Sequence, residues 1–423
     1  MKGVTNPAQL PPNCVLCLTV TDPRIFLPGK RIKAVPEGES PSIASLPRLT
    51  NHSPIWQPEI RDQVTDSKQP DYQLAKAREA VLVPGSKASS NDIKNAAKVP
   101  VMLVQRPGNR DPTNKKLGFA SGWDVIAPLG WGMPLWQCMV MQGGRVGGLR
   151  ELQSLGVEAL SPFEPRCSPD SAAGQQEQSR RTQEEMDDFF RKPPGKRNNY
   201  IKHGIPCPFG APWPLLVQEW SQDSTTQDFY LLRDQKKLRE LRDGTCTVSR
   251  DPRALLMISV RMENAGGLEE WSPVCLPHSE SDLTIPPVEK NHVDESGQLR
   301  KDAREEHQAK LKSLQKERAR EREKGQQPDG AEAMLLSKQH EAHMKSLWLP
   351  EPKELKKLSV RDLLGFVSQG SFSFSEGKAA GVGFITEPGY VALVQTKQWN
   401  PQLNVLVRKK TTMQYRVARL ILL

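Results

Sequence analysis

The sequence predicts an α+β protein in which β-rich core modules are separated by disordered, charged linkers. Short runs of β-branched and aromatic residues, divided by Gly, Asn and Pro, occur near both ends of the chain and in its centre, and such runs are typical of strands. The 423 residues include 36 prolines and 30 glycines, and only 37% are hydrophobic, which is less than compact domains need. We therefore expect several ordered modules rather than one continuous core.

The first ordered segments of the chain are predicted to be strands. Residues 15–20 have the composition of a strand and are followed by a turn and a basic tail, and the apolar run at 99–105 has the length of a buried strand. Residues 35–70 are rich in Pro, Ser and Asp without any period, and residues 72–83 have a short helical pattern. The stretch between the two strands is therefore predicted to be mostly linker.

The central block places three tryptophans among glycines and continues into a polar stretch. Trp123, Trp131 and Trp136 fit core packing, because glycine permits tight turns under large flat rings. The run GGRVGG at 143–148 fits neither nucleotide-binding glycine pattern, although two nearby cations could reach an anion. These cations are Arg145 and Arg150. Residues 168–188 are polar, and we expect an exposed loop that passes into a helix.

A basic segment, RKPPGKRNNYIKHG, follows at residues 191–204. Its proline pair stiffens the chain into an extended form, so its cations are expected to be displayed. A tyrosine ring offers a face on which a base could stack, and asparagines offer hydrogen bonds. The candidate RNA-binding residues here are Lys192, Lys196, Arg197, Asn199, Tyr200 and Lys202. The alternative is a solvated basic loop, and Tyr200 could equally turn inward to anchor it.

Two unlike stretches complete the chain. Residues 297–325 are almost entirely charged and carry no apolar stripe, which predicts a solvated helix or disorder. Residues 358–423 contain short β-patterned runs and predict a small β-barrel or sheet. After Glu387 there are six basic residues and no acidic one, so this module is a second candidate surface for RNA. Its candidate residues are Arg408, Lys409, Lys410 and Arg416.

Composition bounds the class of protein. The net charge of +10 and the isoelectric point near 9.2 favour polyanionic partners. Seven scattered cysteines do not form the framework of a secreted domain, and Cys14 and Cys17 lack the further ligands that a zinc site needs. No apolar run reaches the roughly 18 to 20 residues of a membrane span, and the N-terminus lacks the apolar core of a signal peptide. We expect a soluble, intracellular protein without a metal or cofactor.

Four motifs together resemble the POPLD domain. They are SGWDV at 121–125, GWGM at 130–133, RVGGL at 145–149 and PPGKRNNYIK at 193–202, in the order and spacing of that domain. The POPLD domain belongs to the largest protein subunit of eukaryotic ribonuclease P and ribonuclease MRP. The further segments that resemble this family are 10–14, 19–24, 364–370 and 414–419. The family has a long basic N-terminal half ahead of these motifs, so the sequence resembles its C-terminal portion.

The resemblance and the shifts in composition divide the chain. The expected divisions are 1–34 (a strand and a basic segment leading into the core), 35–98 (a mostly irregular linker), 99–220 (the POPLD-like domain), 221–276 (an α/β segment that completes the core), 277–357 (a charged linker, helical or disordered) and 358–423 (the barrel-like module). The last module is also similar to the closing barrel of the glycine-cleavage aminomethyltransferase superfamily, which we interpret as a shared fold.

The resemblance implies a non-catalytic scaffold subunit that binds the RNase P RNA and the RNase MRP RNA and seats other protein subunits. The RNA would remove 5′ leaders from precursor tRNA and, in the MRP particle, process precursor rRNA. The protein would then have no catalytic residue, would contact precursor tRNA only indirectly, and would lie in the nucleus and nucleolus without a membrane partner.

Two alternative functions stay open at the level of the sequence. The first is a protein–protein adaptor without direct RNA contact, in which the charged 297–325 segment and the Pro-rich loops are docking surfaces. The second is a folate-dependent one-carbon transferase, which the similarity of the last module suggests. No motif places a folate-handling carboxylate for this second alternative.

Overall fold

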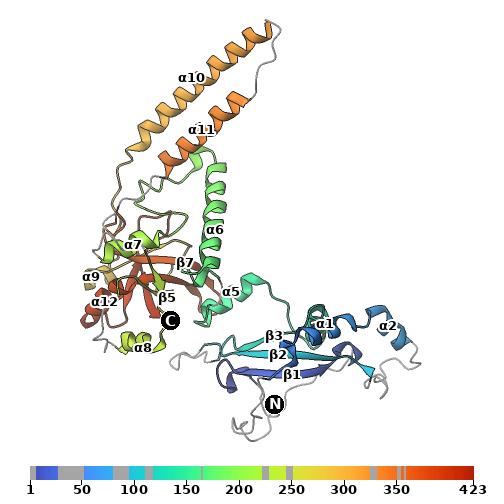
Figure 1. The fold of residues 1–423 in the computed structure, drawn as a ribbon. Helices are drawn as coiled ribbons and strands as arrows, with labels where there is room; N and C mark the ends of the chain where they lie inside the picture. The colour runs from blue at the N-terminus through green and yellow to red at the C-terminus, as the bar shows by residue number, and fades with distance from the viewer. Residues whose placement is uncertain are drawn as a thin grey trace. The chain divides into compact units, whose positions relative to one another are not determined.

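The structure, a computed structural model, describes residues 6–26, 52–79, 95–109, 118–162, 165–221, 228–243, 251–323, 331–349, 354–356 and 359–423. The chain forms two compact units, Met1–Ser161 and Pro162–Leu423 (Figure 1). Helices and strands occur in both units, which confirms the predicted α+β class.

The Met1–Ser161 unit is built on a three-stranded antiparallel sheet. Its strands are β1 (Val15–Thr21), β2 (Lys98–Arg106) and β3 (Gly122–Ile126), with β2 in the centre. Val99 and Val101 of β2 pack with Trp131, whose Nε1 donates a hydrogen bond to the Val64 carbonyl at 3.1 Å. The described helices of this unit are α1 (Pro58–Asp66), α2 (Asp71–Glu79), α4 (Gly132–Met141), α5 (Leu149–Glu158) and the 3-10 helices Pro7–Gln9, Pro23–Phe26 and Pro54–Trp56.

Six strands of the Pro162–Leu423 unit close into a β-barrel. Around the barrel the order is β10-β9-β6-β7-β8-β5, and β5 pairs with β10 to complete the ring. The strands are β5 (Ala254–Met262), β6 (Pro273–Cys275), β7 (Leu363–Ser373), β8 (Lys378–Thr386), β9 (Asn404–Val407) and β10 (Arg416–Leu422), and β4 (Tyr230–Leu231) pairs parallel with β5. Closure of the ring removes exposed sheet edges. The predicted C-terminal barrel is confirmed, and two of its strands come from residues ahead of the 358–423 module.

Both faces of the barrel strands are buried. In β5, Leu256 belongs to one apolar cluster and Leu255 to another, because successive side chains of a strand point to opposite faces. The second cluster also contains Trp213, the first residue of α7 (Trp213–Ser221). Its ring lies 5.8 Å from the ring of Phe366 and 5.7 Å from that of Phe384, so α7 covers this side of the barrel.

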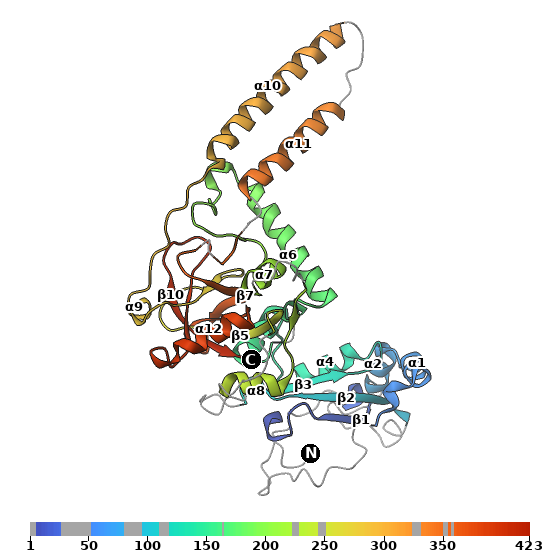
Figure 2. The ribbon, with the colours of Figure 1, turned by 60° about the vertical axis from the view of Figure 1, so that its left-hand side comes forward.

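A long helix and a helical hairpin accompany the barrel. The helix α6 (Ala172–Arg191) begins where the Ser171 hydroxyl accepts a hydrogen bond from the Gly174 N–H at 3.0 Å. The helices α10 (Ser296–Glu323) and α11 (Ala331–Trp348) lie side by side and extend away from the barrel (Figure 2). The other described helices of this unit are α8 (Gln235–Asp243), α9 (Glu280–Thr284), α12 (Glu387–Gln395) and the 3-10 helices Pro165–Cys167, Pro194–Lys196 and Thr396–Gln398.

Two local predictions are wrong. The helix expected to follow the exposed loop at 168–188 is present as α6, but it begins much earlier, at Ala172, because Ser171 caps the helix and Arg180 pairs with Glu177 at 2.8 Å. The proline pair does not start a fully extended segment, since Pro194 begins a 3-10 turn that its fixed φ favours. Two states were predicted for the charged stretch at 297–325, a solvated helix or disorder. The helix is the one observed, as α10.

The predicted linker between the first two strands also contains helix. The helix α1 lies inside residues 35–98, and α2 begins one residue before the predicted helix at 72–83. Residues 35–51 and 80–94 of that linker, and the basic tail at 30–33, lie outside the described residues. The six divisions expected from the sequence stay predictions.

Candidate nucleic-acid interface

The basic segment at 191–204 begins where α6 ends. Lys192 is the C-cap residue of this helix, and Lys196 ends the 3-10 turn that follows it. Both side chains are exposed, and neither has an ion-pair partner within the part of the chain that the structure describes. The two lysines are therefore displayed to solvent, as the sequence predicts.

Arg197 and Tyr200 anchor the segment instead of being displayed. The Arg197 guanidinium donates to the carbonyls of Phe190 at 2.6 Å and Lys192 at 2.8 Å, and it lies 5.0 Å from the centre of the Phe190 ring. Tyr200 is only 8% exposed, and its ring lies 5.4 Å from that of Phe189. Burial raises the pKa of this tyrosine. The predicted stacking face of Tyr200 is thus covered by protein, and the inward alternative is the observed one.

Asn199 and Lys202 hold the second half of the segment to the start of α10. The Asn199 amide donates to the Asp294 carboxylate at 2.6 Å, and its carbonyl oxygen accepts from the Lys202 N–H at 3.1 Å. Burial acts to raise the pKa of Asp294, but hydrogen bonds from Arg300 and Asn199 outweigh it and hold that pKa below the usual range. The Lys202 side chain itself is exposed. Asn199 therefore positions the backbone that presents Lys202.

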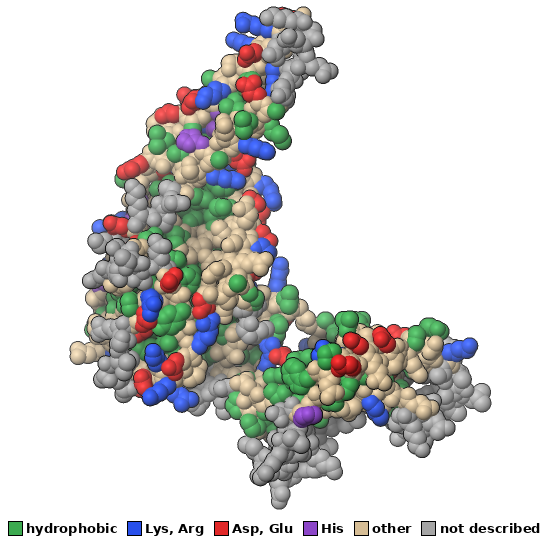
Figure 3. All heavy atoms as spheres, in the orientation of Figure 1, with side chains coloured by type: hydrophobic (Ala, Val, Ile, Leu, Met, Phe, Trp, Pro, Cys, Tyr) green, Lys and Arg blue, Asp and Glu red, His purple; other side chains and the backbone are tan. Residues whose placement is uncertain are grey.

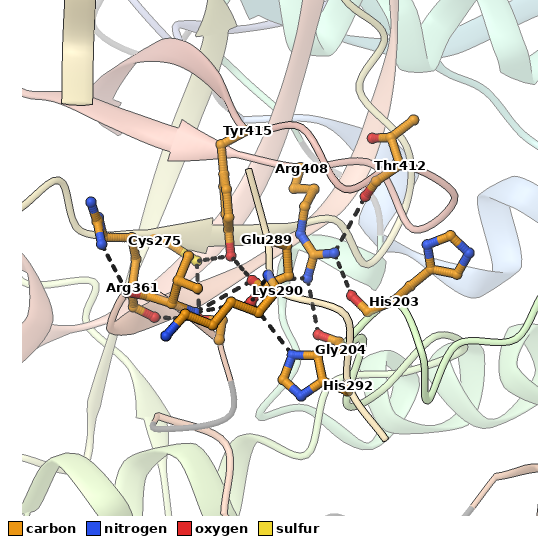
Figure 4. A network of polar contacts seen from close by, with 12 residues as sticks. His203, Gly204, Cys275, Glu289, Lys290, His292, Arg361, Arg408, Thr412 and Tyr415 are labelled. Carbon is orange, nitrogen blue, oxygen red and sulfur yellow. Dashed lines mark hydrogen bonds and ion pairs between the residues drawn. The ribbon is translucent and has the colours of Figure 1, made fainter. Parts of the chain in front are cut away.

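A buried polar network fixes the end of the segment to the barrel (Figure 4). Arg408 is fully buried and donates to the carbonyls of His203 and, at 2.9 Å, of Gly204. Its guanidinium also lies 3.5 Å from the Glu289 carboxylate. The Tyr415 hydroxyl donates to the same carboxylate, so both charges of the pair have hydrogen-bond partners.

Glycine is required at position 204 of this junction. Gly204 has a φ of +58°, and a Cβ there would lie 2.2 Å from Nε2 of His292. The His292 N–H donates to the Lys202 carbonyl at 3.1 Å, which ties the segment to a second strip of chain. The basic segment at 191–204 is therefore held in place by contacts with the rest of the unit and is not a freely solvated loop.

Three consecutive cations of the C-terminal module have three different environments. Arg408 faces the interior, which corrects the expectation that it belongs to an electropositive surface. The Lys410 ammonium lies 2.9 Å from the Glu185 carboxylate and 2.8 Å from the Pro208 carbonyl. Lys409 alone points to a hollow, where its Nζ lies 3.5 Å from Glu269.

Lys409 and Arg416 come together in a cationic hollow of about 180 Å³. The residues that line it are Gly266, Gly267, Val407, Lys409, Thr412, Gln414 and Arg416. The absence of a side chain at Gly267 makes room for Lys409, because a Cβ there would lie 2.3 Å from the ammonium nitrogen. Arg416 is exposed, and to the residues that the structure describes it donates one hydrogen bond, to the Ala265 carbonyl at 2.7 Å. Since a guanidinium has five N–H donors, most of them stay available to an anion.

The central block contributes cations in the other unit of the chain. Arg145 and Arg150 are both exposed, and Arg150 lies in the first turn of α5. The prediction of core packing holds for Trp131, which is fully buried, but not for Trp136, which is 45% exposed. These arginines and the basic segment at 191–204 belong to different units of the chain.

The buried residues of the polar network around Arg408 were not predicted from the sequence. Glu289 and Tyr415 are 126 positions apart, and no local pattern connects them. Cys275 belongs to the same group, and burial raises its thiol pKa to about 11, so it is a poor nucleophile at neutral pH. In the sequence, Glu289 and Arg408 are charged residues within short, otherwise ordinary runs. Such residues are too common to indicate a buried ion pair.

The described residues contain neither a cluster of metal ligands nor a membrane-spanning helix. There, no three His, Cys, Asp or Glu side chains come together as ligands of a metal ion. Cys14 and Cys17 are free thiols. In the same residues, no helix combines the length and the apolar character that crossing a membrane requires.

The fold and this site define a β-barrel protein that presents a cationic loop on a buried polar anchor. The family model of the POP1 C-terminal domain matches residues 254–423, and that of the POPLD (NUC188) domain matches residues 122–213. The chain thus contains regions that match both of these domains, which confirms the resemblance found in the sequence.

Two known proteins are similar to this chain in sequence. The Homo sapiens protein "Ribonucleases P/MRP protein subunit POP1" is 27% identical over 548 aligned positions, which cover 99% of this chain and 52% of that protein. The Schizosaccharomyces pombe protein "Ribonucleases P/MRP protein subunit pop1" is 36% identical over 102 residues, which cover 23% of this chain and 15% of that protein. The chain thus spans about half the length of the human relative.

Proposed function

We propose that the chain is an RNA-binding scaffold subunit of ribonuclease P and ribonuclease MRP particles. The observation that carries this proposal is the display of exposed lysines on a loop whose base is held by the buried Arg408–Glu289 pair. The names of the human and fission yeast relatives support the assignment to these two particles. Rigid presentation matters, because a loop that is already ordered loses little conformational entropy when it binds.

The cations of this surface would bind phosphates. Lys192, Lys196 and Lys202 extend from the loop, and Arg408 joins that loop to the strand end that carries Lys409. Phosphate contacts of this kind fix the position and orientation of the RNA and do not read its sequence. The protein would thereby brace the fold of the RNA.

In this proposal the protein is not itself the catalyst. The particle RNA would perform the cleavage of precursor tRNA leaders and of precursor rRNA, while this chain holds the RNA and other protein subunits in place. Its partners are the RNase P RNA and the RNase MRP RNA, with precursor tRNA as an indirect one. Its location is then that of the particles, the nucleus and nucleolus.

The test removes the two displayed lysines and measures RNA affinity as a function of salt. Lys192→Ala with Lys196→Ala is expected to lower affinity for the RNase P RNA and to reduce the salt dependence by about two phosphate contacts. Arg197 is left in place, because its replacement would also disturb the loop. A filter-binding titration at several salt concentrations provides both numbers.

A matched control replaces two exposed lysines of α8, Lys236→Ala with Lys237→Ala. The control has the same change in net charge but lies on another part of the unit (Figure 1), so it should leave the slope nearly unchanged. Equal slopes for the two double variants would contradict the proposed RNA surface.

The two alternatives are separated by simple measurements. A pure protein adaptor would give no adduct when the purified chain is irradiated with ultraviolet light in the presence of the particle RNA. The folate-dependent transferase is the weaker alternative, and the absence of any thermal shift with a pterin would remove it.

A further inference from the structure

The helix α4 of the Met1–Ser161 unit is apolar on both of its faces. The inner face is formed by Trp131 and Pro134, which are buried, and by Leu135, which packs on the apolar cluster of the sheet. The outer face repeats large apolar residues at the spacing of one helical side, with Met133, Trp136 and Val140 at i, i+3 and i+7. A helix that is apolar all round is normally covered on both sides.

The outer face of α4 is exposed in this unit. The exposed fractions are 59% for Met133, 45% for Trp136, 47% for Met139, 37% for Val140 and 58% for Met141. The apolar surface continues into the next segment through Val146 and Leu149, which are 65% and 77% exposed. Hydrophobic side chains are seen gathered on the surface of this unit (Figure 3). We call this set of seven residues the α4 face.

The segment that follows α4 in the chain carries two cations. No charged residue occurs between Asp124 and Arg145, so α4 and its flanks are uncharged. At the far end stand Arg145 and Arg150, both exposed. Glu151, which follows Arg150, accepts a hydrogen bond from the Gly148 N–H at 2.7 Å, and hydrogen bonds from its own backbone N–H and from that of Gly148 lower its pKa. A ligand of this face therefore meets an apolar strip that ends in two cations.

We propose that the α4 face binds an amphipathic α-helix of a partner protein that carries carboxylates at one end of its apolar stripe. Apolar residues at i, i+3, i+4 and i+7 of the partner would lie along the methionines, and the carboxylates would meet Arg145 and Arg150. Methionine side chains are flexible and polarisable, which suits a surface that receives another helix, and Trp136 provides a large rigid anchor.

A second copy of this chain fits the α4 face less well. A symmetric dimer places the same patch on both sides of the interface, so the arginines would face a surface that offers few carboxylates in return. An RNA would find only two cations and a wide apolar strip that binds no phosphate. The proposal goes beyond RNA binding and does not depend on it.

The binding test uses a fluorescein-labelled synthetic peptide with Leu at the four helical anchor positions and Glu at one end. The peptide with Glu should bind the full chain more tightly than the same peptide with Lys in place of Glu. Met139→Glu should weaken binding by at least about tenfold. Arg145→Glu with Arg150→Glu should reverse the preference between the two peptides. Equal binding of both peptides would overturn the proposal.

The matched control places the same change on an exposed methionine elsewhere. Met334 of α11 is 63% exposed, and Met334→Glu should leave peptide binding unchanged. Met139→Glu should leave RNA affinity unchanged, so failure of this inference and failure of the proposed function are distinguishable. Self-association of the wild-type chain that Met139→Glu abolishes would instead assign the face to a second copy and overturn the proposal.

A second measurement asks whether the α4 face is open in the isolated chain. Hydrogen peroxide should oxidise Met133, Met139 and Met141 quickly, while Met262, which is buried, should react slowly. Addition of the Glu peptide should then slow oxidation of the three exposed methionines. Slow oxidation of these three without peptide would mean that the face is already covered, which contradicts the proposal.

Discussion

Arg408, Lys409 and Lys410 are adjacent in the chain but do different work. Arg408 is fully buried against Glu289, Lys410 is bound by Glu185 and a carbonyl, and Lys409 lines the cationic hollow. Because a charge buried without its partner is costly, only the first of the three is expected to be important for folding. The positive charge of a residue type thus says little about its role until its surroundings are known.

This difference leads to a prediction on stability. Arg408→Ala leaves the Glu289 carboxylate buried without its cation, and it removes the hydrogen bonds to His203 and Gly204. We expect a loss of about 3–5 kcal/mol in the free energy of unfolding. Lys409→Ala, the neighbouring control, should change it by no more than about 0.5 kcal/mol. Urea unfolding followed by circular dichroism measures both, and similar losses for the two variants would contradict this assignment.

At the scale of elements, the α10–α11 hairpin is held at its base more firmly than along its length. Arg300 at the start of α10 is buried, lies 4.3 Å from the centre of the Trp348 ring, and donates to the Leu347 carbonyl at 3.0 Å. Further out, the described side chains of α10 are mostly charged and exposed, in agreement with the missing apolar stripe. Lys and Arg alternate with Asp and Glu over this hairpin in Figure 3.

A pair of histidines joins the two helices of this hairpin. The rings of His307 on α10 and His340 on α11 stack at 3.9 Å with an interplanar angle of 3°. Burial and the neighbouring His307, His343 and Arg304 lower the pKa of His340 from its ordinary value of 6.5. Glu306 and Lys310 of α10 also line the space around the rings, and they pair with each other at 2.6 Å.

The lowered pKa predicts that acid weakens the hairpin. Above pH 6.5 the imidazole is neutral whether or not the helices are together, so it adds no pH dependence. As the pH falls below 6.5, His340 takes up a proton more readily in the separated state, and the preference for the docked state falls until the lower, docked-state pKa is passed. Hydrogen exchange of α11, corrected for its intrinsic pH dependence, should show faster opening at pH 5.5 than at pH 7.5.

The control for this pH effect is His340→Gln, which keeps a polar side chain but cannot be protonated in this range. Its α11 exchange, after the same correction, should depend less on pH than that of the wild type. An equally strong pH dependence in the variant would show that His340 is not the sensitive group.

At the scale of the whole molecule, the chain consists of two units with separate apolar cores. The core of the Met1–Ser161 unit contains Val99, Val101 and Trp131, while the barrel has its own large clusters in the Pro162–Leu423 unit. The matched POPLD region, residues 122–213, runs across the border between the units. A single sequence domain thus contributes to both cores.

Separate cores predict two unfolding transitions. Trp131→Ala should lower the transition of the Met1–Ser161 unit, by about 3–5 kcal/mol for loss of a buried aromatic side chain, and should leave the other transition in place. Arg408→Ala should have the opposite pattern. Scanning calorimetry of the full chain resolves the two, and a single transition that moves as one in both variants would contradict independent folding.

Local patterns in the sequence were enough to determine much of the fold. Alternation of apolar residues predicted the strands at 15–20 and 99–105, and the runs after residue 358 predicted the barrel. The start of α6 was not predicted, because polar composition suggested a loop at residues 168–188 although the Ser171 cap and charge pairs make a helix from Ala172 onward. Closure of the barrel by β5 and β6 was not predictable, because pairing between strands distant in the chain leaves no local pattern.

For the candidate site, the sequence by itself determined that positive charge gathers at 191–204 and after Glu387. It also determined that the chain matches the POPLD and POP1 C-terminal domains. Only the tertiary structure decided which of those residues face solvent. Lys192 and Lys196 are displayed, whereas Tyr200 and Arg408 are turned inward. The physical reason is that burial of a ring or a charge depends on partners far along the chain, such as Phe209 and Glu289, and their positions are set by the fold.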